Sequence, residues 1–228
     1  LAEQTYRLGF DGIANTRGVA ERYRSYGNRT LAFTPGVDRS IFHPGTDGRT
    51  TDAIRIVFYG RPNNVRNGFE LGVEALARIK RLFGDRVEIR SVGADFGAAE
   101  YGLDDVLINL GVLPDLESVA QLYRTSDIGL VFMFTAHPSY QPLEYMASGC
   151  ATVTNLNEAN SWLLENEVNA LCVPPTVSAV VEALSRLITD EEARKQIVAA
   201  GLKTVESLEW EPQLRNIVEW TRTGEEVL

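Results

Sequence analysis

Two arginines lie five residues apart in the segment GRPNNVRNG, residues 60–68. The segment follows an apolar, β-rich run at 54–59 and precedes residues 69–82, in which apolar side chains recur at helical spacing. A guanidinium is permanently charged and can donate two parallel hydrogen bonds to phosphate oxygens. Arg61 and Arg66 therefore predict a site for a diphosphate at the end of a strand. The alternative is a solvated loop whose two charges have no ligand.

A second candidate is the segment TAHPSYQPLEYMASG, residues 135–149, which follows the most continuous apolar run of the chain. We expect Ser139 or Tyr140 to open a helix here, with a proline tolerated in its first turn. The free N–H groups at a helix start can bind an anion. Glu144 lies about one turn into this helix, from where its carboxylate can reach the hydroxyls of a ribose. The alternatives are an exposed helical carboxylate at Glu144 and a turn-capping role for His137.

A third candidate is the polar segment NLNEAN, residues 155–160, whose alternative reading is an ordinary connector. Other site classes lack their signatures. The sequence has no Gly-rich dinucleotide fingerprint after the first strand, no phosphate-binding P-loop and no Asp-x-Asp pair. Its two histidines, His43 and His137, lie far apart, so no metal cluster is expected. Cys150 and Cys172 lie in or beside apolar runs, and we expect both to be buried thiols.

Strand-like and helix-like segments alternate along the chain, which predicts an α/β fold. Expected strands cover 13–15, 30–33, 54–59, 87–92, 107–110, 128–134, 151–154 and 171–173. Expected helices cover 17–26, 69–82, 116–123, 142–147, 161–164, 177–188, 191–207 and 214–220. The fold class is a Rossmann-like parallel sheet with helices on both faces. Such sheets bind ligands at the carboxyl ends of their strands, where the candidate segments begin.

The composition limits the possible classes of protein. Of the 228 residues, 44% are hydrophobic, which is enough for a buried core and excludes wholesale disorder. The net charge of −9 argues against a nucleic-acid partner, because binding phosphates along a nucleic acid needs a basic face. No apolar run approaches the ~18 residues that a membrane-spanning helix needs, and no signal peptide is visible. We therefore expect a cytoplasmic protein with no transmembrane segment.

Several of these residues, in this order, resemble the carboxyl-terminal, donor-binding half of GT-B glycosyltransferases of the large retaining family four, also called glycosyltransferase group 1. Gly60-Arg61 followed by Arg66 resembles that family's Gly-Arg…Lys pair, with arginine in place of the usual lysine. The segment PLEYMASGCATVTN, 142–155, resembles the family's Pro-Leu-Glu-Ala-Met-Ala stretch. The resemblance covers about residues 53–222. It departs from the family at Ala136, where the first carboxylate of the family's Glu-x7-Glu motif is expected.

The resemblance implies a site for a nucleoside diphosphate sugar, which is a substrate, with no cofactor and no metal. Arg61 and Arg66 would stabilise the leaving diphosphate, and Glu144 would bind the ribose. The remaining residues implied to contact the donor are Gly60, Asn67, His137, Ser139, Tyr140, Gln141 and Leu143. The nucleobase of the donor is expected to contact the loop after Val92 or the loop after Leu110.

The segment HPSYQPLE, together with the earlier Arg-Pro-Asn…Arg-Asn, is closest to rhamnosyltransferases that use dTDP-L-rhamnose in bacterial surface-glycan synthesis. UDP- and GDP-sugars stay open as donors. The resemblance implies a hexosyl transfer with retention of configuration to a glycan or lipid-linked glycan, in the cytoplasm or peripherally at the inner face of the bacterial membrane. The alternatives are a non-catalytic nucleotide-sugar-binding or scaffolding module and a GT-B-type sugar-nucleotide epimerase.

The resemblance also predicts the domain organisation. Residues 1–45 would be the tail of an amino-terminal acceptor domain and the interdomain linker, and residues 46–228 the donor-binding domain with its carboxyl-terminal helices. The acceptor would bind through the missing part of the amino-terminal domain, so we expect this chain alone to be inactive in transfer. Trp210 and Trp220 are expected either to pack against the amino-terminal domain or to lie in the donor domain's own core.

Overall fold

The structure, a computed structural model, describes residues 2–45 and 52–224. Its main sheet has six strands, all parallel, in the order β5-β4-β3-β6-β7-β8. The strands are β3 (Ile54–Tyr59), β4 (Val87–Val92), β5 (Ile108–Asn109), β6 (Ile128–Leu130), β7 (Ala151–Thr154) and β8 (Leu171–Cys172). From β3 the chain builds outward to β5 and then returns to the other side of β3. The order therefore reverses between β3 and β6, and this switch point is where parallel sheets of this class form their ligand crevice.

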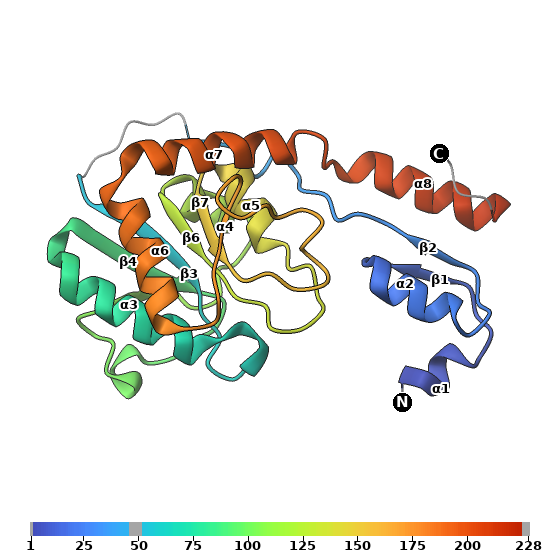
Figure 1. Cartoon of the computed structure of the whole chain (residues 1–228), viewed down its shortest axis with the longest axis horizontal. Helices are drawn as coiled ribbons and strands as arrows, with labels where there is room; N and C mark the ends of the chain where they lie inside the picture. The colour runs from blue at the N-terminus through green and yellow to red at the C-terminus, as the bar shows by residue number, and fades with distance from the viewer. Residues whose placement is uncertain (1, 46–51, 225–228) are drawn as a thin grey trace.

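Helices cover both faces of the sheet, which confirms the predicted fold class (Figure 1). Ile54, Ile56 and Phe58 of β3 pack in one hydrophobic cluster with α3 (Phe69–Phe83) and α6 (Val177–Thr189). Val57, from the opposite side of the same strand, packs in a second cluster with α4 (Leu116–Arg124) and α5 (Gln141–Ser148). α7 (Glu191–Val205) follows α6 and packs against α5 and β7. Short 3-10 helices are η1 (Val65–Asn67), η2 (Gly84–Arg86) and η3 (Ala98–Tyr101).

The amino-terminal segment forms a separate small unit (Figure 1). Its elements are α1 (Ala2–Tyr6), β1 (Gly12–Ala14), α2 (Arg17–Arg24) and β2 (Thr30–Ala32), and β1 and β2 pair in parallel. The last helix, α8 (Trp210–Thr223), runs from α7 towards this unit. Trp220, near its end, is buried with the Arg29 guanidinium 5.7 Å from its ring centre. Trp220 therefore packs against the amino-terminal segment. The boundary expected between residues 45 and 46 adjoins residues 46–51, which lie outside the described residues.

Three expectations about local structure were wrong. The strand expected over 128–134 ends at Leu130, because side-chain amides take up the backbone groups of the following residues. Residues 161–164, expected as a helix, form no helix, and 161–163 lie in a turn. Cys172, expected to be buried, is partly exposed at the end of the edge strand β8, whereas Cys150 is buried as predicted.

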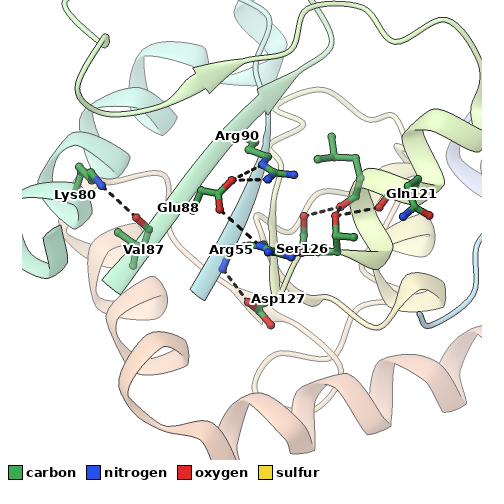
Figure 2. A network of polar contacts seen from close by, with 10 residues as sticks. Arg55, Lys80, Val87, Glu88, Arg90, Gln121, Ser126 and Asp127 are labelled. Atoms are coloured by element: carbon green, nitrogen blue, oxygen red, sulfur yellow. Dashed lines mark hydrogen bonds and ion pairs between the residues drawn. The ribbon is translucent and has the colours of Figure 1, made fainter. Parts of the chain in front are cut away.

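A polar network fixes the alignment of the strands at the end of the sheet opposite the crevice (Figure 2). The Asp127 carboxylate accepts a hydrogen bond from the Arg55 backbone N–H at 2.8 Å, and Asp127 N–H donates to the Arg55 oxygen at 2.8 Å. The Arg55 guanidinium lies 3.6 Å from Glu88, which also pairs with Arg90. These contacts lie near the starts of β3, β4 and β6, so this network orders the sheet and lies away from the candidate site.

Candidate functional site

The loop after β3 begins with a close backbone approach to β4. Gly60 N–H donates to the Val92 oxygen at 2.9 Å, and a Cβ on Gly60 would lie 2.5 Å from Ser91 Oγ. Only glycine therefore fits without displacement of a neighbour. Arg61 follows directly, partly buried, with its guanidinium 3.5 Å from the Tyr59 hydroxyl. The arginine is thus held at the carboxyl end of the sheet.

Asn67 joins this loop to the chain that follows β6. Its side chain is 1% exposed, and its Nδ2 donates to the Phe132 oxygen at 3.2 Å. Phe134 N–H in turn donates to the Arg66 oxygen at 2.8 Å. Arg66 itself is exposed. The Asn67 side chain thus bonds the backbone of the neighbouring loop, and it brings Arg66 beside the second candidate segment.

The second segment turns sharply before α5. Ser139 has a φ of 53°, in the left-handed region that few non-glycine residues adopt. Its N–H donates to His137 Nδ1 at 3.1 Å, and its hydroxyl donates to Gln141 Oε1. Tyr140 occupies the N-cap position of α5 without a capping side-chain bond, and Pro142 lies in the first turn. The start of α5 therefore lacks a side-chain cap of its own and faces the crevice at the switch point.

The charges of the two loops act on each other. The pKa of His137 is lowered, first by burial and second by the nearby Arg66 guanidinium. Glu144 is partly buried and, within 2–45 and 52–224, its carboxylate has no hydrogen-bond or ion-pair partner. Burial raises the pKa of Glu144 to about 7. A partly buried carboxylate without a partner, one turn into a helix at the end of a strand, is suited to binding a polar ligand.

Leu143 has a different place from the other predicted residues. It is 1% exposed and packs in the second hydrophobic cluster with Tyr145 and Met146. Its side chain therefore anchors α5 to the core. Gly60, Arg61 and Arg66 lie in the loop after β3, and Arg66 is close to His137, which is hydrogen-bonded to Ser139 as Ser139 is to Gln141. The binding roles of these residues and of Glu144 in α5 stay predictions.

The asparagines of the third segment support the second one. Asn155 accepts a hydrogen bond from Met133 N–H at 2.8 Å and donates to the Met133 oxygen at 2.9 Å. Asn157 Nδ2 donates to the same oxygen at 3.0 Å and to the His137 oxygen at 3.2 Å. The sequence did not predict this supporting role. An asparagine-rich loop beside a helix start is the signal that could have suggested it, because amide side chains can bond backbone groups in both directions.

A cavity of about 420 Å³ opens beside the two loops. Apolar side chains make most of its wall: Phe134, Leu156, Val173, Pro174 and Pro175. Two of its lining residues are bonded to the candidate loops, Phe134 to Arg66 and Asn157 to His137. The cavity therefore adjoins the candidate loops and can accept a group with an apolar face.

The loops after β4 and β5 form a second platform at the same edge of the sheet. Gly93 N–H donates to the Gly111 oxygen at 2.9 Å. Asn109 Nδ2 donates to the oxygens of Ala94 at 3.2 Å and Phe96 at 2.9 Å. Val112 is exposed beside them. The nucleobase was expected at these loops. The hydrogen bonds join the two loops to each other.

Within the described ranges, 2–45 and 52–224, no group of three or more His, Cys, Asp or Glu side chains lies close enough to hold a metal ion. No helix in these ranges has the length and apolar character needed to cross a membrane.

Comparisons with known proteins agree with this architecture. Residues 54–185 match the family model described as WsaF, C-terminal domain. The O-antigen biosynthesis protein RfbC of Myxococcus xanthus is 43% identical over 96% of this chain, which spans 17% of that protein. The chain spans about half the length of the D-inositol 3-phosphate glycosyltransferases that it matches, such as that of Geodermatophilus obscurus, with 26% identity over 94% of this chain and 53% of that protein.

Solved structures with the same fold include two proteins of low sequence identity. The C-terminal domain of the glycosyl transferase group 1 family protein LpcC from Francisella tularensis has a TM-score of 0.67 and 21% identity over 77% of this chain and all of that one. Anabaena HepE in complex with UDP and glucose has a TM-score of 0.76 and 18% identity over 92% of this chain and 62% of that one. At these identities the likeness establishes the fold alone.

Proposed function

The chain belongs to the family of the WsaF C-terminal domain, and on this premise we propose that it binds the nucleotide-sugar donor of a glycosyltransferase. The observation that carries the proposal is the junction of two loops at the switch point of the sheet. Arg66 lies there close to His137, just before α5, Arg61 lies in the same loop as Arg66, and Glu144 lies in the first turns of the helix without a partner in the described residues. The HepE complex with UDP and glucose supports a nucleotide sugar as the ligand class.

The chemistry of transfer explains why these groups are needed. A glycosyl transfer releases a nucleoside diphosphate, on which negative charge develops as the glycosidic bond breaks. Two guanidinium groups and the helix start can stabilise that charge because they are fixed in place before the reaction. With this charge compensation the leaving group needs no metal ion, which is our proposal for this family member. The resemblance to family four adds retention of the anomeric configuration to the proposal.

We further propose that the donor is a 6-deoxy sugar, specifically rhamnose carried by dTDP. Ala136 stands where the related enzymes are implied to carry a carboxylate toward the sugar, and the neighbouring cavity has mainly apolar walls. Burial of a methyl group against such apolar side chains is favourable in free energy, whereas the hydroxymethyl group of glucose would lose hydrogen bonds to water there. UDP- and GDP-sugars are the competing donors.

The product and place of the reaction belong to the same proposal. The identity with RfbC, an O-antigen biosynthesis protein, supports a bacterial surface glycan or its lipid-linked precursor as the acceptor. With such an acceptor, we propose that the protein acts in the cytoplasm or peripherally at the inner face of the bacterial membrane. Because transfer needs both reactants in one cleft, we expect residues 1–228 to bind the donor and to transfer no sugar.

Calorimetric titration with dTDP, UDP and GDP tests the proposal, with and without EDTA. We expect dTDP to bind most tightly, unaffected by EDTA, and Arg66→Ala and Glu144→Ala each to weaken it by about tenfold, as expected for a charge-assisted contact. Arg81→Ala, which removes an exposed arginine on α3, is the matched control and should leave the affinity unchanged. Preference for UDP or GDP would retain the function and overturn the rhamnose donor. No binding of any nucleotide would favour a scaffolding module.

A further inference from the structure

A chain of aromatic rings leads from the candidate site to the hinge of the molecule. The centroid of the Tyr140 ring lies 6.4 Å from that of His137 and 5.9 Å from that of Trp210. The Trp210 ring lies 6.3 Å from Phe33, which directly follows β2. Trp210, the first residue of α8, is therefore in contact with both Tyr140, just before α5, and the amino-terminal segment.

The backbone of Trp210 is fixed on the side away from the site. A Cβ on Gly36 would lie 2.7 Å from Trp210 N, so the two backbones are in close contact. Val37 N–H donates to the Leu208 oxygen at 2.8 Å, and Thr34 N–H donates to the Gln213 side chain at 3.2 Å. Here the chain that leaves β2 and the chain between α7 and α8 run side by side (Figure 1). The indole is thus attached to the hinge where the chain passes between the two units.

Tyr140, the partner of Trp210 in this contact, lies between a residue with positive φ and a helix start that has no side-chain cap. Its side chain gives no hydrogen bond that caps α5, and its backbone oxygen accepts the first helical bond, from Glu144 N–H at 3.0 Å. Ser139, before it, is held at a φ of 53°. Such a conformation persists only where surrounding contacts determine it. The ring of Tyr140, which lies between those of His137 and Trp210, supplies such contacts next to Ser139, in addition to the hydrogen bonds of Ser139 to His137 and Gln141.

From this geometry we infer that Trp210 is a positioning residue for donor binding. Its indole holds Tyr140, and through Tyr140 it holds the turn at 137–139 and the start of α5 in the conformation that binds the donor diphosphate. The arrangement of the hinge and the shape of the diphosphate site are thereby coupled. The ligand in this inference rests on the proposed function, whereas the control of the loop by Trp210 does not.

Hydrogen–deuterium exchange of the whole chain tests the control of the loop without any ligand. We expect Trp210→Leu to speed amide exchange at 137–145 by about fivefold, which corresponds to the loss of one or two aromatic pairs. Trp210→Phe should have a smaller effect, and Tyr140→Leu should reproduce the pattern from the other side of the contact. Trp220→Leu is the matched control, because it loosens the same helix where the helix meets Arg29 and leaves Tyr140 untouched.

Nucleotide binding gives the second readout. In Trp210→Leu we expect the affinity for a nucleoside diphosphate to fall by about fivefold and that for the monophosphate to fall less, while Trp220→Leu changes neither. Exchange at 137–145 that stays at the wild-type rate in both Trp210→Leu and Tyr140→Leu would overturn the inference, as would equal acceleration in Trp220→Leu. If the wild-type chain binds no nucleotide, the proposed function fails, and the exchange rates alone decide whether Trp210 positions the loop.

Discussion

The side-chain amide of Asn67 donates to the backbone oxygen of Phe132 at 3.2 Å and so joins the loop after β3 to the chain after β6. A second hydrogen bond joins the same two segments, because the backbone oxygen of Arg66 accepts from Phe134 N–H. These are the two loops of the switch point. Two hydrogen bonds therefore set how far Arg66 lies from the start of α5, although neither bond involves a charged group.

The first prediction concerns this connection. Asn67→Ala removes the donor to a buried carbonyl, and leaving that acceptor unpaired should lower the free energy of unfolding by about 1–3 kcal/mol. The melting temperature should fall, and nucleotide affinity should fall with it because Arg66 loses its support. Thermal unfolding and calorimetry measure the two effects. Asn63→Ala, on an exposed residue of the same loop, is the control. An Asn67→Ala protein with unchanged stability and affinity would show that the bond does not position the loop.

A second prediction tests the close approach at Gly60. The added Cβ of Gly60→Ala would meet Ser91 Oγ at 2.5 Å and the Phe58 ring at 3.0 Å, so we expect a loss of about 1–3 kcal/mol. The buried Ser91 hydroxyl has no hydrogen-bond partner in the described residues, so Ser91→Ala alone should be nearly neutral. The double variant should recover part of the loss.

Urea unfolding of the four proteins gives the coupling between the two positions, which we expect to be about 1 kcal/mol. Gly18→Ala in α2 is the opposite control. A Cβ there meets nothing within 4 Å, and alanine favours a helix, so this variant should be slightly more stable. Simple additivity of Gly60→Ala and Ser91→Ala would mean that the hydroxyl is not the limiting contact.

Much of this architecture could be predicted because it depends on local patterns. The alternation of apolar strands with helical repeats predicted the fold class. Arg61 and Arg66 follow one predicted strand and Glu144 follows another, which predicted that all three lie at one edge of a parallel sheet. The structure adds that these strands, β3 and β6, are neighbours at the switch point. Strand order depends on long-range pairing, which no local pattern in the sequence encodes.

The parts that could not be predicted rest on contacts between distant residues. The run at 128–134 is as apolar as a full strand, yet Asn67 and Asn155 bond the backbone of its second half and end the ladder at Leu130. The positive φ of Ser139 follows from the path of the loop and not from serine's own preference. The contact of Trp210 with Tyr140 joins residues 70 positions apart, and the sequence left the place of that tryptophan open.

A third prediction follows from the backbone of Ser139. Glycine accepts a φ of 53° without the penalty of a Cβ, so Ser139→Gly should gain roughly 1 kcal/mol from relief of strain. The lost hydrogen bond to Gln141 should offset about the same amount, leaving Ser139→Gly close to the wild type. Ser139→Ala keeps the strain and loses the bond, so it should be about 1 kcal/mol less stable than Ser139→Gly.

Urea unfolding ranks these variants, and calorimetry compares their nucleotide affinities. Glu167 also has a positive φ, 62°, but lies in the loop before β8, away from the helix start. Glu167→Gly should therefore change stability and leave nucleotide affinity unchanged. If Ser139→Ala proves as stable as Ser139→Gly, the left-handed conformation is not under strain.

The last prediction uses the raised pKa of Glu144, which burial moves from the usual 4.5 to about 7. Between these values the folded protein keeps a proton that the unfolded chain has lost, so stability falls as the pH rises through this window and levels off above about 7. Glu144→Gln is neutral at every pH and lacks this fall. It should be more stable than the wild type by about 1–3 kcal/mol at pH 8 and by little near pH 4.

Urea unfolding between pH 4 and 8 measures the difference, with Glu70→Gln as the control, because Glu70 is an exposed carboxylate in the first turn of α3. The proposed ribose contact predicts the opposite change in binding. Glu144→Gln should weaken nucleotide affinity at pH 8, because a neutral amide accepts hydrogen bonds less strongly than a carboxylate does. If Glu144→Gln is more stable than the wild type but binds nucleotide more weakly, the Glu144 carboxylate contributes to ligand binding at a cost in stability. An unchanged pH dependence of stability would show that Glu144 is already ionised in the folded protein near pH 5.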